Sequence, residues 1–301
     1  MPTHQLQGLV QRQALSSFEL QAVQQLAEIC EKAEQIHLRV IWDLLRERLE
    51  IEALDFLYYD DGAVVGYLCL DDHGMEAKEV VAYVHPAYRR RGIFRQLLAA
   101  AWKESRLFGI ERYLFICDEQ SQSGLACLQA IGATLDFSEH DLILHSQLKA
   151  TVFDHRLHVR QATLADLEAL AQIQSESFGD PINVVRLRLA QRLENPLARF
   201  SLATLGEPGI TCHEPVGCLR VRDWQAYTSI YGFGVRPDYQ GKGYGRQLLE
   251  TVIAQLQRES SKPVQLDVDT SNQPADHLYR SCGFQPRATY GYYALSIKDG
   301  R

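Results

Sequence analysis

The feature that most constrains this chain is an internal repeat. Residues 85–98, with the sequence HPAYRRRGIFRQLL, match residues 236–249, RPDYQGKGYGRQLL, at an offset of 151. Three further pairs keep this offset without a gap: Gly66 with Gly217, Val84 with Val235, and Gly132 with Gly283. Because the offset is constant over about 70 residues, the chain contains two copies of one domain rather than a solenoid of short units. We predict two domains, at residues 1–150 and 151–301.

Alternating and periodic apolar residues predict the elements of the second copy. Strands are expected at residues 157–161, 199–205, 216–221, 229–235, 264–268 and 290–297. Helices are expected after Thr163, at 184–193, after residue 243 and at 275–281. Thr163 and Asp166 form a capping box at the start of the first of these helices. The first copy follows the same order, with a longer helical stretch at 17–49, so each copy is expected to be a mixed α/β sheet.

Composition excludes several classes of protein. Apolar residues make up 46% and charged residues 23%, which is typical of a globular chain and not of a disordered or coiled-coil protein. No apolar run reaches the ~20 residues of a membrane span, and we expect neither a signal peptide nor a membrane partner. Seven cysteines without a CxxC pair predict reduced thiols in the cytoplasm and no metal site.

Charge is distributed unevenly between the two copies. Residues 1–150 carry 14 Lys and Arg against 22 Asp and Glu, whereas residues 151–301 carry 17 against 16. Neither half is strongly basic, so nucleic acid is not an expected partner. A small polyanionic ligand is expected in the second half, where the repulsion is weaker.

A glycine-rich loop, QGKGYG at residues 240–245, follows a predicted strand and opens a predicted helix. Its glycines let backbone N–H groups turn inward, and the helix N-terminus adds about half a positive charge. Together these form a cradle for a phosphate or pyrophosphate, with Lys242 and Arg246 as mobile charges at its rim. The spacing excludes a P-loop, because Gly243 stands where Ser or Thr is required, and a dinucleotide fingerprint, because Arg246 stands where the third glycine is required.

The pattern QxxGxG at 240–245, after a strand that ends in Val-x-Pro, resembles the acyl-CoA pyrophosphate loop of the GNAT superfamily of N-acetyltransferases. Downstream, NxxAxxLYxxxGF at 272–284 looks like that family's second signature. The resemblance covers residues 157–297 and, in degenerate form, 9–148. It implies two tandem GNAT-like domains, each with a mixed, mostly antiparallel central sheet flanked by helices, and acetyl-CoA as the acyl donor.

The resemblance also implies direct attack of a substrate amine on a bound acetyl thioester. The pyrophosphate would be held by the loop and the start of the helix: Gln240, Gly241, Lys242, Gly243, Tyr244, Gly245 and Arg246. Phe233, Gly234 and Val235 would pair with the pantetheine arm, and an N–H group near Phe233 or Val235 would stabilise the developing oxyanion. Asn272 would hydrogen-bond the pantetheine, and Tyr279 matches the family's general acid for the departing thiolate.

The sequence does not identify the general base or the acceptor. The strand at 229–235 contains no carboxylate. Asp223, Asp267 and Asp269 are interpreted as solvated or capping aspartates, and His213 and His277 as surface residues. The parts of this fold that bind the acceptor, here residues 177–194 and 206–215, carry no recognisable code. The second of these segments is longer than its counterpart in the first copy, and we expect it to help select the acceptor.

The first copy departs from the pattern. Its loop keeps the first polar residue and the middle glycine but has Phe94 in place of the last glycine. At the second signature, Leu128 stands where the second copy has its tyrosine, and Ser121 where it has its asparagine. Leucine has no proton to give. We therefore predict a first domain that is catalytically weak or silent but still binds CoA or shapes the substrate cleft.

The predicted function is an acetyl-CoA-dependent N-acetyltransferase with its chemistry in the C-terminal domain. Its acceptor is the primary amine of a small molecule or peptide, and the protein acts as a monomer or homodimer. Two alternatives stay open: a non-catalytic acyl-CoA sensor or scaffold, and an enzyme in which both domains are active. Another donor, such as succinyl- or propionyl-CoA, is also compatible with the sequence.

Overall fold

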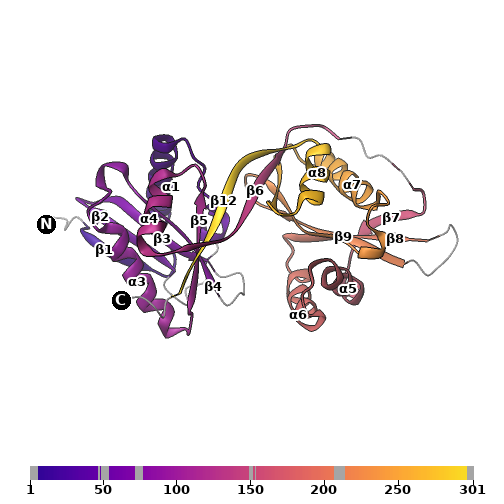
Figure 1. Ribbon diagram of the computed structural model, residues 1–301, viewed down its shortest axis with the longest axis horizontal. Helices are drawn as coiled ribbons and strands as arrows, with labels where there is room; N and C mark the ends of the chain where they lie inside the picture. Colours follow the sequence, from indigo (N-terminus) through magenta and orange to yellow (C-terminus); the bar gives the residue numbers. More distant parts are fainter. Residues whose placement is uncertain are drawn as a thin grey trace. The chain divides into compact units, whose positions relative to one another are not determined.

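A computed structural model describes residues 6–46, 48, 54–71, 77–148, 152, 154–206 and 214–296 (Figure 1). The chain forms two compact units: unit 1 contains Met1–His140 and Ala288–Arg301, and unit 2 contains Asp141–Arg287. No helix among the described residues is long and apolar enough to cross a membrane. The six described cysteines are free thiols, as predicted, and Cys212 lies outside the described residues.

Unit 1 is a sheet with helices on both faces. Its strands lie in the order β1 (Gly8–Arg12), β2 (Asp55–Asp60), β3 (Ala63–Asp71), β4 (Ala77–Val84), β5 (Arg112–Asp118) and the end of β12 (Phe284–Ser296). All neighbouring pairs in this series are antiparallel except β4 and β5, which are parallel. α1 (Ser17–Glu34) and α2 (Trp42–Arg46) pack on one face, and α3 (Ile93–Leu107) and α4 (Gln122–Ile131) on the other.

Unit 2 repeats this arrangement. Its strands lie in the order β7 (Leu157–Gln161), β8 (Ala198–Leu205), β9 (Glu214–Asp223), β10 (Thr228–Val235), β11 (Val264–Asp269) and the end of β6 (Thr134–Leu144). Again the fourth and fifth of these strands are the parallel pair. α5 (Leu167–Phe178) and α6 (Ile182–Leu193) cover one face, and α7 (Tyr244–Glu259) and α8 (Gln273–Ser281) the other. The strands and helices predicted within residues 157–281 of the second copy are therefore confirmed within a few residues.

The last strand of each copy is exchanged. β6 begins in unit 1 and ends in unit 2, and β12 begins in unit 2 and ends in unit 1. The prediction that 290–297 closes the sheet of its own copy is wrong, because Tyr290–Ser296 pairs with β5 of unit 1. With 11 and 13 residues at ~3.3 Å each, both strands are long enough to serve two sheets. The compact units therefore differ at their ends from the ranges 1–150 and 151–301, which stay a prediction for the duplicated sequence.

The first helix of each copy begins with the same device. Ser16 and Glu19 form a capping box before α1, and Thr163 and Asp166 form one before α5. An arginine from the preceding strand binds each acid: Arg12 with Glu19 at 2.8 Å, and Arg160 with Asp166 at 2.6 Å. The capping box predicted at Thr163 is confirmed, and its counterpart at Ser16 supports the duplication.

The single helical stretch predicted at 17–49 is wrong. α1 ends at Glu34, and Gln35 takes the left-handed conformation with φ 56°. Its N–H group bonds the carbonyl of Glu31, and Ile36 then turns into the interior, where it is 6% exposed. Burial of Ile36 offsets the cost of the left-handed residue and separates α1 from α2.

Candidate functional site

The glycine-rich loop of unit 2 leaves a helix N-terminus open. Gly241 and Gly243 have φ values of 72° and 86°, which residues with a side chain rarely adopt. Gly243 is the N-cap of α7, and no side chain caps that end. The first N–H groups of α7 are therefore available to an anion, which the helix dipole also favours.

The polar side chains of this loop are bound within the fold. Gln240 Nε2 donates to the carbonyl of Val235 at 2.8 Å, and Lys242 Nζ donates to the carbonyl of Asp238 at 2.7 Å. Arg246 binds Ser281 Oγ at 2.5 Å and Glu250 at 3.4 Å. The structure thus differs from the expected mobile charges at the rim, because nearby acceptors hold Lys242 and Arg246. Backbone N–H groups are left as the main donors of the cradle.

β10 departs from regular pairing where the pantetheine arm is expected. Its parallel pairing with β11 ends at Ile230 and Leu266. Its pairing with β9 shifts register between Tyr231 and Gly234, and Gly232 between them has φ 54°. The edge of residues 231–235 that faces β11 is therefore unpaired, and it can accept an extended amide-rich ligand as an added half-strand.

Tyr279 lies beside this edge. The side chain projects from α8 and is 7% exposed, and its ring centroid is 6.1 Å from that of Phe233 and 6.0 Å from that of Phe284. Burial raises the pKa of the Tyr279 hydroxyl well above its usual range. Among the residues that the structure describes, the hydroxyl has no hydrogen-bond partner in the protein. It is a protonated donor positioned next to the strand that sequence reasoning assigned to the thioester.

Asn272 has a structural task as well. It is the N-cap of α8, and its side-chain oxygen accepts from the N–H group of Ala275 at 3.2 Å. In unit 1, Ser121 does the same for α4, with Oγ accepting from Gly124 at 3.1 Å. The alignment of these two positions is thus supported by geometry. The Nδ2 group of Asn272 is not used by this cap, so its predicted contact with pantetheine stays a prediction.

The candidate acids of unit 2 are engaged in structural contacts. Asp223 binds Arg199 at 3.0 Å and Thr228 at 2.8 Å, and Asp269 accepts from the N–H group of Ser271 at 2.7 Å. His277 is exposed on α8, and His213 lies outside the described residues. Within the described part of the chain, no group of three His, Cys, Asp or Glu side chains is placed to hold a metal ion.

The loop of unit 1 keeps the backbone shape of its counterpart. Arg90 and Gly92 have φ values of 65° and 81°, at the positions of the two loop glycines of unit 2. Arg89 Nε donates to the carbonyl of Val84 at 3.1 Å, as Gln240 does to Val235. An arginine that holds the left-handed conformation shows that the surrounding fold dictates this turn even without its first glycine.

The aromatic residue near the loop lies on different elements in the two units. In unit 2 it is Phe233 of β10, and a Cβ atom at Gly245 would lie 3.5 Å from its ring, an ordinary van der Waals contact. In unit 1 the aligned pair is Phe94 and Ala82, and the Phe94 ring lies 6.3 Å from the Phe115 ring. The aromatic ring has therefore moved from the strand to the helix. The loop keeps its backbone shape with Phe94 in this position.

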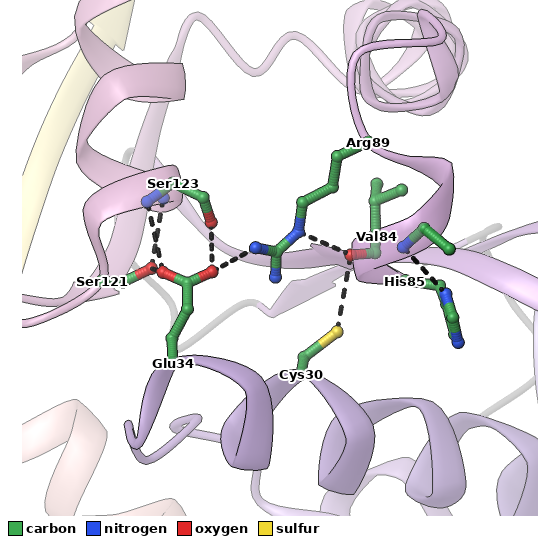
Figure 2. A network of polar contacts seen from close by, with 9 residues as sticks. Cys30, Glu34, Val84, His85, Arg89, Ser121 and Ser123 are labelled. Atoms are coloured by element: carbon green, nitrogen blue, oxygen red, sulfur yellow. Dashed lines mark hydrogen bonds and ion pairs between the residues drawn. The ribbon is translucent and has the colours of Figure 1, made fainter.

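A polar network in unit 1 joins the end of α1 to the segments that follow the parallel strands β4 and β5 (Figure 2). Glu34 at the end of α1 accepts from Ser121 Oγ at 3.0 Å, from Ser123 Oγ at 2.5 Å and from the N–H group of Ser123 at 3.2 Å. Arg89, in the loop after β4, forms an ion pair with the same carboxylate. Burial opposes ionisation, but the Ser123 and Ser121 hydrogen bonds and the Arg89 charge hold the pKa of Glu34 below its usual value. No local sequence pattern predicts this network, because it joins three segments that are distant in the chain.

A cavity of about 590 Å³ lies in unit 1 where β4 and β5 part. Their parallel pairing ends at Val80 and Phe115. The cavity is lined by residues of both faces of the sheet, including Tyr83 and Ile116 on the α1 face and Phe94 and Leu128 on the α3 face. Leu128 is buried at the position of Tyr279, so this cavity has no hydroxyl at that point.

Comparisons with known proteins agree with this architecture. The sequence profile of the Acetyltransferase (GNAT) family matches residues 20–132 and again 167–284. Mycothiol acetyltransferase of Thermomonospora curvata is 29% identical over 238 residues, covering 76% of this chain and 77% of that protein. Mycothiol acetyltransferase of Thermobifida fusca is 34% identical over 130 residues, which are 42% of this chain and 36% of that protein.

Two solved structures share the fold along the whole chain. A GCN5-related N-acetyltransferase from Sphaerobacter thermophilus superposes with a TM-score of 0.78 at 20% identity, covering 97% of both chains. A tandem GNAT protein from the clavulanic acid biosynthesis pathway gives 0.73 at 19% identity, covering 97% of this chain and 99% of that one. With the double match of the family profile, these findings show that the chain belongs to the GNAT family of acetyltransferases.

Proposed function

We propose that unit 2 transfers an acetyl group from acetyl-CoA to the primary amine of an acceptor. The open N-terminus of α7 would bind the pyrophosphate through backbone N–H groups of residues 241–246. Beside the bulge of β10, the unpaired edge of residues 233–235 would bind the pantetheine arm. An N–H group of this edge would bind the thioester oxygen and stabilise the charge that develops there.

Tyr279 would supply the proton for the leaving group. The amine nitrogen attacks the thioester carbon, the carbon–sulfur bond breaks, and the sulfur takes a proton from the Tyr279 hydroxyl. The attacking nitrogen loses its extra proton to solvent or to a base that the sequence does not identify. The raised pKa of Tyr279 keeps its hydroxyl protonated before the reaction, so the hydroxyl can donate a hydrogen bond to the sulfur as negative charge develops there. Solvent returns a proton to the tyrosine oxygen after each turnover.

The names of the relatives point to different acceptors. The relatives include mycothiol acetyltransferases, a ribosomal protein bS18 alanine N-acetyltransferase of Bacillus subtilis and an L-amino acid N-acyltransferase of Escherichia coli. The segment 206–215, which the sequence suggested for acceptor selection, lies largely outside the described residues. The common element is acyl transfer to an amine, and this is the activity we propose.

The observation that carries the proposal is the coincidence of three features in unit 2: an uncapped helix end, a bulged unpaired strand edge and a buried tyrosine beside it. The two copies offer a matched test. Gly243→Asp places a carboxylate in the unit 2 loop, and Gly92→Asp does the same in unit 1 at nearly the same φ. Release of free thiol from acetyl-CoA with a panel of amines should fall about 1000-fold with Gly243→Asp, since like charges cost several kcal/mol.

Gly92→Asp should leave turnover within about threefold of the unaltered protein. Equal losses in the two variants would assign chemistry to both units. A loss only with Gly92→Asp would contradict the proposal. If the unaltered protein binds acetyl-CoA but acetylates no amine of the panel, the sensor or scaffold alternative replaces it.

The cavity of unit 1 favours a second function, in which unit 1 binds CoA without catalysing acetyl transfer. It lies between the parting strands beside a loop of preserved shape, but Leu128 replaces the acid. Titration calorimetry with CoA should then give two sites per chain, of which Gly92→Asp removes one. A stoichiometry of one that Gly243→Asp abolishes would show that unit 1 is closed to the carrier.

A further inference from the structure

Four arginines gather on one face of unit 2: Arg188 and Arg192 on α6, and Arg220 and Arg222 on β9. Side chains alternate along β9, with Cys218 in the core under α5 and α6 and Leu219 in the core under α7. Arg220 and Arg222 therefore share the α5–α6 face with Cys218. Arg192 follows Leu189, which packs in that same core, by three residues.

Three of these arginines, Arg192, Arg220 and Arg222, have no acidic partner in the described part of the chain. Arg220 lies over the ring of Tyr231 at 4.7 Å and Arg222 over that of Trp224 at 3.8 Å. The Nε atom of Arg222 is buried without a hydrogen-bond partner. Arg188 meets Asp180 at 3.3 Å, but no carboxylate of the described residues pairs with Arg192, Arg220 or Arg222.

Mutual repulsion accompanies this lack of partners. Burial first, and then the charge of Arg192, lower the pKa of Arg220 to about 10, and burial with the charge of Arg188 lowers that of Arg192. Other partly buried arginines of the chain are compensated: Arg48 meets Asp55 at 3.4 Å, and Arg236 binds Glu176 at 2.8 Å. Keeping like charges together without a counter-ion costs stability, which is typical of a site that binds an anion.

The arginines lie at the reactive end of the strand and not at the phosphate end. Arg220 pairs in register with Tyr231, the first residue of the bulge, and Arg222 pairs with Ser229. Tyr231 lies four positions and Ser229 six positions before Val235, which is about 13 Å and about 20 Å along a strand. The glycine-rich loop follows Val235, so these guanidinium groups lie nearer the bulge of β10 than the loop proposed for the pyrophosphate.

Resting on the proposed function, we propose that the acceptor amine carries an anionic group, which Arg220 binds together with Arg192 and Arg222 on the α5–α6 face. A carboxylate or a phosphate fits, because guanidinium binds either through two parallel hydrogen bonds. The rings of Tyr231 and Trp224 hold two of the guanidinium planes in place before binding, which reduces the ordering cost. The anion would orient the acceptor so that its amine faces the bulge of β10.

The test compares acceptors that differ only in the second group. All three are primary amines in which two CH₂ groups separate the amine from the second group. That group is an uncharged hydroxyl in ethanolamine, a carboxylate in β-alanine and a phosphate in O-phosphoethanolamine. We expect kcat/KM for one anionic acceptor to exceed that for ethanolamine at least 100-fold, and the preferred anion identifies the source. Arg220→Met should reduce this ratio at least tenfold, mainly through KM. Equal kcat/KM for the neutral and anionic amines would overturn the inference while leaving the acetyltransferase proposal intact.

Arg258→Gln is the matched control. It removes one positive charge from the same unit, on α7, where Arg258 Nε donates to the carbonyl of Ala254 at 3.1 Å. The acceptor ratio should be unchanged in this variant. A drop equal to that of Arg220→Met would show that net charge, and not a site, sets the preference, and would overturn the inference.

A binding measurement separates this inference from catalysis. N-acetyl-β-alanine should raise the melting temperature of the full chain, and N-acetylethanolamine should not, because only the former carries the anion. Arg220→Met should abolish the shift. If no amine is acetylated but this shift is found, the proposed function fails and the anion site stands. If neither compound shifts the melting temperature at millimolar concentration, the site is refuted.

Discussion

The two units have loops of the same backbone shape but differ in how the buried charges near their sheets are paired. In unit 1, buried Arg48 is neutralised by Asp55, which also accepts from the hydroxyl of Tyr67. In unit 2, the strand position that pairs with Arg220 is Phe200, whereas the corresponding pair of unit 1 is Cys69 with Asp55. Unit 1 therefore contains a counter-ion for its buried arginine, whereas in unit 2 Arg192, Arg220 and Arg222 have no carboxylate partner among the described residues.

The same contrast appears at the second signature. The N-cap hydrogen bonds at Ser121 and Asn272 are equivalent, but seven residues after the cap unit 1 has Leu128 and unit 2 has Tyr279. In unit 1, Glu34 joins the loop to α4 through Arg89 and Ser123. Duplication has kept the backbone hydrogen bonds that make the fold, while the side chains that carry chemistry have diverged.

The largest expected effect is that of Tyr279→Phe. Loss of the proton donor should lower kcat about 100-fold or more, with little change in KM for acetyl-CoA. Because burial raises the pKa of Tyr279 well above its usual range, the unaltered enzyme should show no loss of rate from its ionisation up to pH 10. Tyr113→Phe removes a buried hydroxyl of unit 1, which contacts Ser105 at 2.7 Å, and should leave kcat unchanged. Turnover unaffected by Tyr279→Phe would remove the acid assignment.

The next effect concerns stability. Asp55→Ala leaves the Arg48 charge buried without its partner and should lower the free energy of unfolding by about 3–5 kcal/mol, measured by urea denaturation. A double variant, Arg48→Met with Asp55→Leu, should recover most of this loss, since it removes both charges. Arg220→Met in unit 2 should cause no comparable loss, because Arg220 has no acidic partner to leave behind. Destabilisation by Arg220→Met as large as that of Asp55→Ala would remove the contrast between the units.

The smallest effect is expected for Glu34→Gln. At pH 7 it should cost about 1 kcal/mol, since the hydrogen bonds to a charged acceptor become bonds to a neutral one. The pKa of Glu34 is lowered in the folded state, so its contribution is present above the unfolded value of about 4.5 and disappears as pH falls through the lower folded value. The difference in melting temperature from the unaltered protein should therefore shrink in acid. Glu28→Gln, on the exposed face of α1, is the control and should show no such difference at either pH.

Local sequence determined much of this protein. The offset of 151 residues predicted the duplication, the apolar periodicity predicted the strands and helices of the second copy, and Thr163 with Asp166 predicted a capping box that is present. The glycine-rich loop was found for the same reason: its conformation depends on residues that are adjacent in the chain, at Gly241 and Gly243. The family resemblance followed from these local patterns and is supported by the profile match in both copies.

Only the tertiary structure decided which strand completes which sheet, where α1 ends and which charges meet. The pairing of Tyr290–Ser296 with β5 joins residues more than 170 positions apart. When two strands are possible partners, the local sequence of an edge strand does not specify which of them it pairs with. Glu34 accepts from Ser123 across 89 residues, and Arg192, Arg220 and Arg222 gather on one face with no carboxylate partner in the part of the chain that the structure describes. Hydrogen bonding within a turn is specified by neighbours in the sequence, whereas the burial and pairing of a charge depend on every element packed around it.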